Sequence, residues 1–141
     1  MCSIIGYSGN EIAAPIIVKG LKRMEYRGYD SVGVATKSEN QIELKKGIGK
    51  VNEVNSKIQL DTLPGKIGIG HTRWATHGKV TDLNAHPHPS NSGKIAIVHN
   101  GIIENFEELK KQLEDDGYNF KSETDSEIIA NLLQKNYEST K

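Results

Sequence analysis

The one cysteine of this 141-residue sequence, Cys2, lies directly behind the initiator methionine. Removal of Met1 would place a thiol and a free α-amino group on the same residue. An α-amino group has an ordinary pKa of about 7.7 to 8.0, so near neutral pH part of it is uncharged and can accept the thiol proton during attack on a carbonyl carbon. The position predicts an N-terminal nucleophile that needs no histidine base. The alternative is a small apolar residue that starts a buried strand.

Arg73 and Asp125 together match the two charged groups of a free α-amino acid. A guanidinium group binds a carboxylate through two parallel hydrogen bonds, and a carboxylate can hold an ammonium group. Taken singly, Arg73 could form a surface salt bridge and Asp125 could offset a helix dipole. The pair is more informative than either member, and it predicts an amino acid pocket.

Asn100 and Gly101 offer a side-chain amide and a backbone N–H to an oxyanion that develops beside the nucleophile. Such a donor contributes about 2.7 to 4 kcal/mol of transition-state stabilisation in other enzymes. The alternative is an ordinary turn, because Asn-Gly is also a common hairpin signal. Trp74 could stack on a ligand, or it could be a partly buried aromatic residue.

The histidines offer a rival constellation, because imidazole is a frequent metal ligand. They are His71, His77, His86, His88 and His99. No pair has the i,i+4 spacing of a helical zinc site, and few carboxylates lie nearby in the sequence. We therefore expect no bound metal and no cofactor.

Hydrophobic spacing and turn residues predict the elements that must position these side chains. We expect strands at residues 3–7, 32–36, 42–45, 67–71, 94–99 and 118–121, and helices at residues 12–25, 50–60, 105–116 and from 124 onward. Capping residues are expected at Asn105 and Thr124, and the last helix should turn Ile128, Ile129, Leu132 and Leu133 inward. Residues 74–93 have the composition of an ordered functional loop rather than of a core element.

Composition excludes several functional classes. Lys plus Arg and Asp plus Glu number 18 each, so no net field favours nucleic acid or an anionic membrane. A single cysteine excludes an intramolecular disulfide and indicates a reducing, cytoplasmic location. No apolar run approaches the roughly 18 residues of a membrane span, and the length fits one domain.

Several separate stretches resemble the glutaminase domains of the glucosamine-6-phosphate synthase family, the glutamine-dependent fructose-6-phosphate aminotransferases. These are class II glutamine amidotransferases, which are N-terminal nucleophile hydrolases. The similar stretches are the Met1-Cys2 start and residues 25–31, 71–78, 84–88, 99–105 and 123–125, so the resemblance covers essentially the whole chain. The sequence of residues 74–77 favours this sugar-aminating branch over other class II members.

The resemblance implies a role for each candidate residue. Cys2 would attack the glutamine side-chain amide while its α-amino group moves the proton, and a thioester would then be hydrolysed to leave glutamate and ammonia. Asn100 and the Gly101 N–H would form the oxyanion hole. The binding residues would be Arg73 and Asp125 at the α-carboxylate and α-amino groups, with Trp74, Thr76 and His77 in a loop that closes over the amino acid.

The implied fold class is α+β, a four-layer αββα sandwich that we expect to be incomplete at its C-terminal end. Residues 1–141 would be the N-terminal portion of the glutaminase domain. The ammonia would pass to fructose-6-phosphate on a sugar-phosphate isomerase domain that this chain lacks, and a homodimer is among the assemblies allowed. The alternatives are a catalytically silent glutamine-binding or interaction fragment, and class II chemistry with another acceptor. Ser3 stands where the family typically has glycine.

Overall fold

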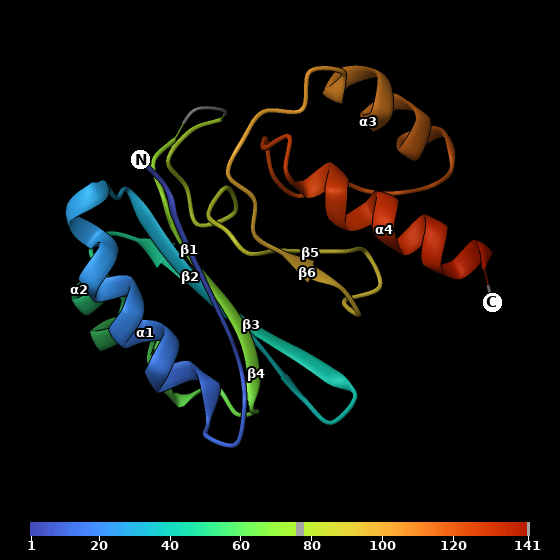
Figure 1. The fold of residues 1–141 in the computed structure, drawn as a ribbon. Helices are drawn as coiled ribbons and strands as arrows, with labels where there is room; N and C mark the ends of the chain where they lie inside the picture. The colour runs from blue at the N-terminus through green and yellow to red at the C-terminus, as the bar shows by residue number, and fades with distance from the viewer. Residues whose placement is uncertain (76–77, 141) are drawn as a thin grey trace.

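The computed structural model describes residues 1–75 and 78–140. Two sheets lie between two layers of helices, with α1 and α2 on the outer side of the larger sheet and α3 and α4 beyond the smaller one (Figure 1). The elements are β1 (Ser3–Ser8), α1 (Ala13–Met24), η1 (Glu25–Arg27), β2 (Ser31–Ser38), β3 (Gln41–Ile48), α2 (Val51–Ile58), η2 (Leu60–Thr62), β4 (Ile67–Arg73), β5 (His88–Pro89), β6 (Ala96–Ile97), α3 (Phe106–Asp115) and α4 (Glu127–Ser139). The arrangement is the expected α+β, αββα order of layers.

The larger sheet has the antiparallel order β1-β4-β2-β3, and α1 packs on one of its faces. Two glycines of β4, Gly68 and Gly70, make room for the helix, because a Cβ at either position would run into the side chain of Ile17. Gly20 of α1 faces Ile5 of β1 in the same way. The helix therefore approaches the sheet closely, and its apolar face forms the main core with residues of β2, α2 and η2.

The opposite face of the larger sheet carries a polar row that runs across three strands. His71 of β4 pairs in register with Gly33 of β2, and Gly33 pairs with Lys46 of β3. Paired residues point to the same face of a sheet. Residues 84–88 lie across this row, since a Cβ at Gly33 would overlap the His86 carbonyl oxygen, and the Lys46 ammonium donates to the carbonyls of residues 83, 85 and 87.

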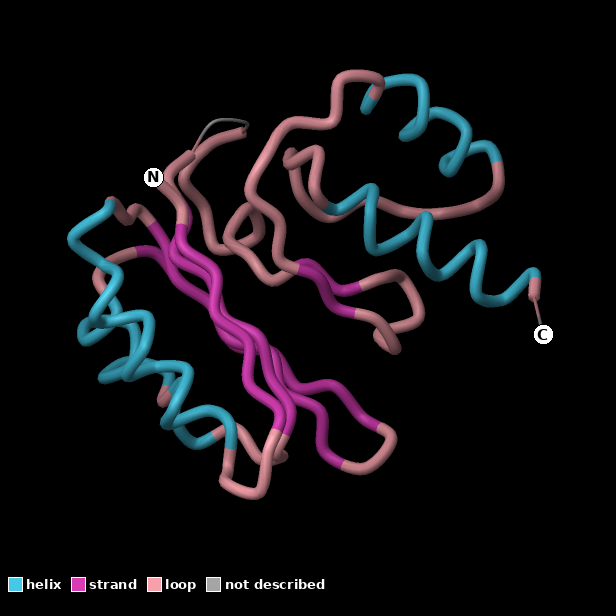
Figure 2. Tube along the Cα trace, in the orientation of Figure 1, coloured by secondary structure: helices cyan, strands magenta, loops and turns pink. Residues whose placement is uncertain are grey.

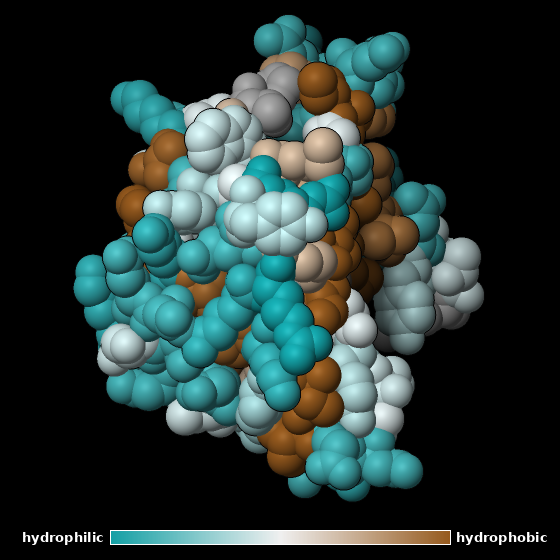
Figure 3. All heavy atoms as spheres, turned by 60° about the vertical axis from the view of Figure 1, so that its left-hand side comes forward, coloured by the Kyte–Doolittle hydropathy of each residue, from teal (hydrophilic) through white to brown (hydrophobic). Residues whose placement is uncertain are grey.

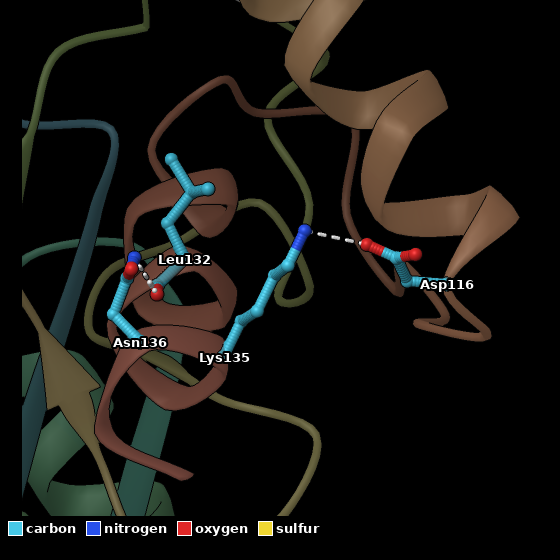
Figure 4. A network of polar contacts seen from close by, with 4 residues as sticks. All are labelled: Asp116, Leu132, Lys135 and Asn136. Atoms are coloured by element: carbon cyan, nitrogen blue, oxygen red, sulfur yellow. Dashed lines mark hydrogen bonds and ion pairs between the residues drawn. The ribbon is translucent and has the colours of Figure 1, made fainter. Parts of the chain in front are cut away.

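The second half of the chain contains more loop than the first (Figure 2). In the described residues β5 and β6 form a two-stranded antiparallel sheet, and α4 packs on both strands. The ion pair between Lys135 Nζ of α4 and Asp116 Oδ2 at the end of α3 measures 2.6 Å and links the two helices (Figure 4). Both side chains are nearly half exposed, so solvent screens the pair and it contributes little to stability.

The outer surface of the larger half is mainly hydrophilic. Figure 3 brings the side of α1 and α2 forward, where hydrophilic residues cover most of the face and hydrophobic atoms show between them. Across residues 1–75 and 78–140, none of the helices is long and apolar enough to cross a membrane.

The secondary structure expected for residues 1–73 is confirmed, with shifts of a few residues at element ends. The second half needs corrections. Residues 118–121 form no strand, because the Asn119 N–H is bound by the side chain of Asn91 rather than by a neighbouring strand. The strand expected at residues 94–99 is reduced to β6, and its partner β5 lies inside the segment expected to be a loop.

The capping residues expected for the last two helices are also corrected. Asn105 is the N-cap of α3, but within the described chain its side chain makes no capping hydrogen bond. Thr124 does not cap α4, which begins after Ser126; the Thr124 hydroxyl instead contacts His88, and Glu127 accepts from the N–H groups of residues 121 and 122. Leu133, expected inward, is exposed.

The inward face of α4 is partly polar. Ile128 and Ala130 are buried as an amphipathic helix requires, but Asn131 and Gln134 are buried beside them. Their side-chain oxygens accept from the backbone N–H groups of Asn91 and Ser92 in the turn after β5. These hydrogen bonds explain why Asn131 and Gln134 are buried on the inward face, which the sequence analysis had assigned to apolar residues that include Leu133.

We predict that Gly33→Ala destabilises the fold by about 1 to 3 kcal/mol, because the added methyl group overlaps the His86 carbonyl and cannot be relieved by a side-chain rotation. Urea unfolding measures the change. The matched control is Gly6→Ala, another strand glycine, where the nearest atom to an added Cβ lies 3.9 Å away. Equal stability of the two variants would contradict the close packing of residues 84–88 on the sheet.

Candidate active site

A pocket of about 330 Å³ opens where the two halves of the molecule meet, at the start of β1 and the end of β4. Six of the residues expected to act together line it: Cys2, Arg73, Trp74, Asn100, Gly101 and Asp125. Four stretches of chain far apart in sequence contribute them. The other two expected residues, Thr76 and His77, lie outside the described residues.

The Cys2 side chain is held beside the backbone of Trp74. The Trp74 N–H donates to Cys2 Sγ at 3.0 Å, and the Trp74 carbonyl lies 3.4 Å from the same sulfur and can accept the thiol proton. Cys2 is partly buried, whereas the Trp74 ring is 54% exposed at the rim of the pocket. The thiol therefore has a defined position while it stays accessible from the pocket.

The α-amino group in this structure belongs to Met1. It donates to the Arg27 carbonyl at 2.7 Å, and the Met1 sulfur contacts the Arg27 guanidinium. Gly28 has a φ of +130° and passes so close to Met1 that a Cβ there would lie 2.7 Å from the amino nitrogen. While Met1 is present the Cys2 nitrogen belongs to a peptide bond, and it cannot act as a base.

The Asn100 side chain connects Cys2 to the larger sheet. Its Nδ2 donates to the Cys2 carbonyl at 3.2 Å, and its Oδ1 lies 2.7 Å from His71 Nε2. Gly101 follows with a φ of +152°, a backbone conformation that favours glycine. The amide of Asn100 thus lies beside Cys2 in the pocket.

Arg73 is buried at the end of β4, and its Nη1 donates to the Lys79 carbonyl at 3.0 Å. The chain around it is held by Asp30, which sequence reasoning had placed in a motif without a role. The Asp30 N–H donates to the Arg73 carbonyl at 2.7 Å, and Asp30 Oδ2 accepts from the Ala75 N–H at 2.5 Å. Asp30 therefore sets the path of the chain on both sides of Trp74.

Asp125 is buried just before α4, and its Oδ2 accepts from the Ile103 N–H at 2.7 Å. Its two neighbours are tied to histidines. Thr124 Oγ1 lies 2.8 Å from His88 Nε2, and Ser126 Oγ lies 3.0 Å from His99 Nδ1. The carboxylate therefore faces the pocket from a segment that is held on both sides.

The residues that follow Gly78 are anchored by Asn84 and Glu123, which sequence reasoning did not single out individually. Asn84 Nδ2 donates to the Lys79 carbonyl at 2.7 Å, and Asn84 Oδ1 accepts from the Glu123 N–H at 2.8 Å. The Glu123 carboxylate accepts from the Lys79 N–H, a hydrogen bond that lowers the pKa of its carboxyl group. One signal was available, since both residues lie in stretches that carry the family resemblance.

Three of the expected histidines form a buried stack. The ring of His86 lies parallel to that of His71, with centroids 4.2 Å apart, and meets the ring of His88 edge-on at 4.5 Å. Burial lowers the pKa of His71 to about 4, and burial together with the neighbouring rings lowers the pKa of His86 further. The pKa of His88 is lowered as well, first by burial and second by the charge of Lys46. The rings are therefore neutral at physiological pH.

Three ring nitrogens of the stack face hydrogen-bond partners. His86 Nδ1 accepts from the His99 N–H at 3.4 Å, and ring nitrogens of His71 and His88 face Asn100 and Thr124. In the part of the chain that the structure describes, no group of three or more histidine, cysteine or acidic side chains is arranged to hold a metal ion.

Lys46 is a partly buried cation that sequence reasoning did not find. Burial lowers the pKa of its ammonium group to about 8, against the opposing effect of the Glu127 and Asp82 charges. The three backbone carbonyls of residues 83, 85 and 87 take its hydrogen bonds at 2.7 to 3.2 Å. Lys46 therefore fixes the segment that carries His86.

Ser3 does not face the nucleophile. Side chains alternate along a strand, and Ile5, two residues on, contacts the helix side of the sheet. Ser3 therefore points toward the helix layer, opposite to the pocket. Its hydroxyl is buried and, among the residues described, has no hydrogen-bond partner.

The chain is similar to known proteins over nearly its whole length. A family described as the glutamine amidotransferase domain matches residues 57–140. The glutamine–fructose-6-phosphate aminotransferase (isomerizing) of Pyrococcus horikoshii is 59% identical over 136 residues, which is 96% of this chain and 23% of that protein. The protein of the same name from Caldanaerobacter subterraneus subsp. tengcongensis is 56% identical over 137 residues, 97% of this chain and 22% of that protein.

Two solved structures are also similar to this chain. Glutamine phosphoribosylpyrophosphate amidotransferase from B. subtilis, complexed with ADP and GMP, matches with a TM-score of 0.80 and 32% identity over 96% of this chain and 29% of that one. A structure described as the allosteric regulatory enzyme of purine biosynthesis matches with a TM-score of 0.78 and 34% identity over 92% and 28%. The resemblance and the fold class expected from sequence are confirmed. The chain spans less than a quarter of the length of the two aminotransferases.

We predict that stability falls as pH is lowered from about 6.5 toward 4. The pKa values of the three stacked histidines are lowered in the folded state, so over this range the unfolded chain binds protons that the folded chain does not. Each histidine costs about 1.4 kcal/mol per pH unit where the unfolded state is fully protonated. Urea unfolding at pH 7.5, 6.0 and 5.0 measures the slope. His86→Gln should reduce it, and an unchanged slope in that variant would contradict the assignment.

We predict that Ser3→Ala raises the free energy of unfolding by about 1 kcal/mol, because it removes a buried hydroxyl without a partner. Thermal unfolding checks this. Ser8→Ala is the control, since Ser8 lies on the same strand and is exposed. A clear loss of stability in Ser3→Ala would mean that the hydroxyl is hydrogen-bonded in solution.

Proposed function

Because the chain belongs to the glutamine amidotransferase domain family, we propose that it hydrolyses the side-chain amide of glutamine with Cys2 as the nucleophile. The observation that carries the proposal is that Cys2, Asn100, Arg73 and Asp125 line one pocket. A guanidinium and a carboxylate match the α-carboxylate and α-amino groups of an amino acid, and the thiol lies in the same pocket for its side chain.

The proposed reaction begins with the Cys2 thiol. Sγ attacks the amide carbon of the glutamine side chain, and the thiol proton moves to the α-amino nitrogen of Cys2. The negative charge that develops on the amide oxygen is stabilised by Asn100 Nδ2 and the Gly101 N–H. The carbon–nitrogen bond then breaks, the proton passes to the departing nitrogen, and ammonia leaves behind a γ-glutamyl thioester.

The second half of the reaction uses water. The α-amino group of Cys2 accepts a proton from a water molecule as its oxygen attacks the thioester carbon, and the same oxyanion donors act again. The carbon–sulfur bond breaks, the proton returns to sulfur, and glutamate is released. Both halves need a free amino group on Cys2, so removal of Met1 is part of the proposal.

The proposed acceptor of the ammonia is fructose-6-phosphate. The relatives with 56 to 59% identity carry that substrate in their names, whereas the solved phosphoribosylpyrophosphate amidotransferase is 32% identical. Residues 1–141 would act as the N-terminal portion of a glutaminase domain, and a sugar-phosphate isomerase domain would bind the acceptor. A lone cysteine fits the reducing cytoplasm. A homodimer stays a prediction.

We predict that treatment with an electrophilic glutamine analogue adds one group to Cys2 of the protein that lacks Met1, and that excess glutamine prevents the addition. Intact-mass measurement followed by peptide mapping detects it. Cys2→Ala should lose both the adduct and glutamate release, the latter by at least about 10³-fold, because no other thiol exists in the chain.

Two variants test the pocket. Arg73→Ala should weaken protection by glutamine, because the α-carboxylate loses its partner, while Arg23→Ala, an exposed arginine in the last turn of α1, should leave protection unchanged. A trimmed protein that gains no adduct would contradict the proposal and favour the silent-fragment alternative.

A further inference from the structure

His71 makes one side-chain hydrogen bond whose direction can be deduced. The residue is fully buried on the face of β4 that carries the pocket, and its Nε2 lies 2.7 Å from Asn100 Oδ1. The chemistry proposed above does not use it. His71 is therefore a buried titratable group that contacts a proposed oxyanion donor without reaching the pocket itself.

The orientation of the Asn100 amide follows from its other neighbour. The Cys2 carbonyl oxygen can only accept a hydrogen bond, so the atom that faces it at 3.2 Å must be the amino group, Nδ2. The carbonyl end of the same amide then faces His71 and can only accept. His71 Nε2 must therefore carry a hydrogen, and in the neutral ring Nδ1 is left without one.

The neutral ring is the form that the surroundings favour. His71 Nδ1 is buried and, in residues 1–75 and 78–140, has no hydrogen-bond partner. A proton there would be a buried donor without an acceptor, which costs more than a bare lone pair. Burial lowers the pKa of the ring to about 4, and it outweighs the opposing effects of the Asn100 side chain and the His99 backbone carbonyl. The parallel ring of His86, 4.2 Å away, limits the rotation of His71.

We propose that His71 is a positioning residue that sets the orientation of the Asn100 amide by donating from Nε2 to Oδ1, so that Nδ2 faces Cys2. The inference rests on the proposed glutaminase function. If the amide were reversed, Oδ1 would face both the Cys2 carbonyl and the developing oxyanion, and it would repel both. The donor from β4 selects the productive orientation.

The first test needs no variant. Nitrogen-15 NMR of the histidine side chains distinguishes a nitrogen that carries a hydrogen from one that does not. For His71 in the trimmed wild-type protein at pH 7 we expect a protonated Nε2 and a bare Nδ1. A protonated Nδ1 with a bare Nε2 would overturn the inference, whether or not the protein hydrolyses glutamine.

The second test is a double-mutant cycle on glutamine hydrolysis. His71→Met removes the donor at similar volume, and we expect kcat to fall about 10- to 100-fold with KM within about threefold, since the groups that bind the amino acid remain. Asn100→Ala should lower kcat about 10²- to 10³-fold. If His71 acts through Asn100, adding His71→Met to Asn100→Ala changes kcat less than threefold, and a full additive loss would overturn the inference.

Two further variants separate positioning from stability. His71→Gln keeps an N–H donor and should restore most of kcat lost in His71→Met. His88→Met removes a buried histidine of the same stack that contacts Thr124 instead, so its effect should be the same with and without Asn100→Ala. A wild-type protein without glutaminase activity would refute the proposed function, whereas an active wild type with additive His71 and Asn100 effects would refute only this inference.

Discussion

The seating of residues 84–88 on the larger sheet is the constraint on which the rest of the structure depends. This segment has almost no ladder hydrogen bonds of its own, yet it is buried. The Lys46 ammonium donates hydrogen bonds to the backbone carbonyls of residues 83, 85 and 87, within and next to this segment. Gly33 has no side chain, which leaves room for the carbonyl of His86. Buried carbonyls without hydrogen-bond partners would destabilise the fold. The hydrogen bonds from Lys46 therefore allow this segment to be buried without regular secondary structure. The second half of the chain is built upon it.

The three stacked histidines connect residues 84–88 to the pocket through hydrogen bonds. Each neutral ring uses a nitrogen for one contact: His71 with Asn100, His88 with Thr124, and His86 with the backbone of His99. A chain of such contacts links the larger sheet to the segments before α3 and α4. Because the interior has a low dielectric, these hydrogen bonds are strong when complete and costly when broken. The same network therefore ties the positions of Asn100 and Thr124 to the neutral form of the buried rings.

The two faces of β4 serve different purposes. Gly68 and Gly70 on one face admit α1 and make the apolar core, while His71 and Arg73 on the other face point toward the pocket. Alternation along a strand makes this division possible within seven residues. Ser3 lies on the helix side of the neighbouring strand, so a side chain at that position stays clear of the nucleophile.

The sequence by itself determined the elements of residues 1–73, because their burial depends on periodic apolar residues and on glycines that mark close approach. It also identified the pocket residues, through chemical type and family resemblance. Only the tertiary structure decided the secondary structure of the second half. There, side chains such as Asn91 and Glu127 accept hydrogen bonds from backbone N–H groups that strand pairing or helix capping would otherwise use. The roles of Lys46 and Asp30 were likewise invisible, because they depend on contacts between segments distant in sequence, and no local pattern encodes such contacts.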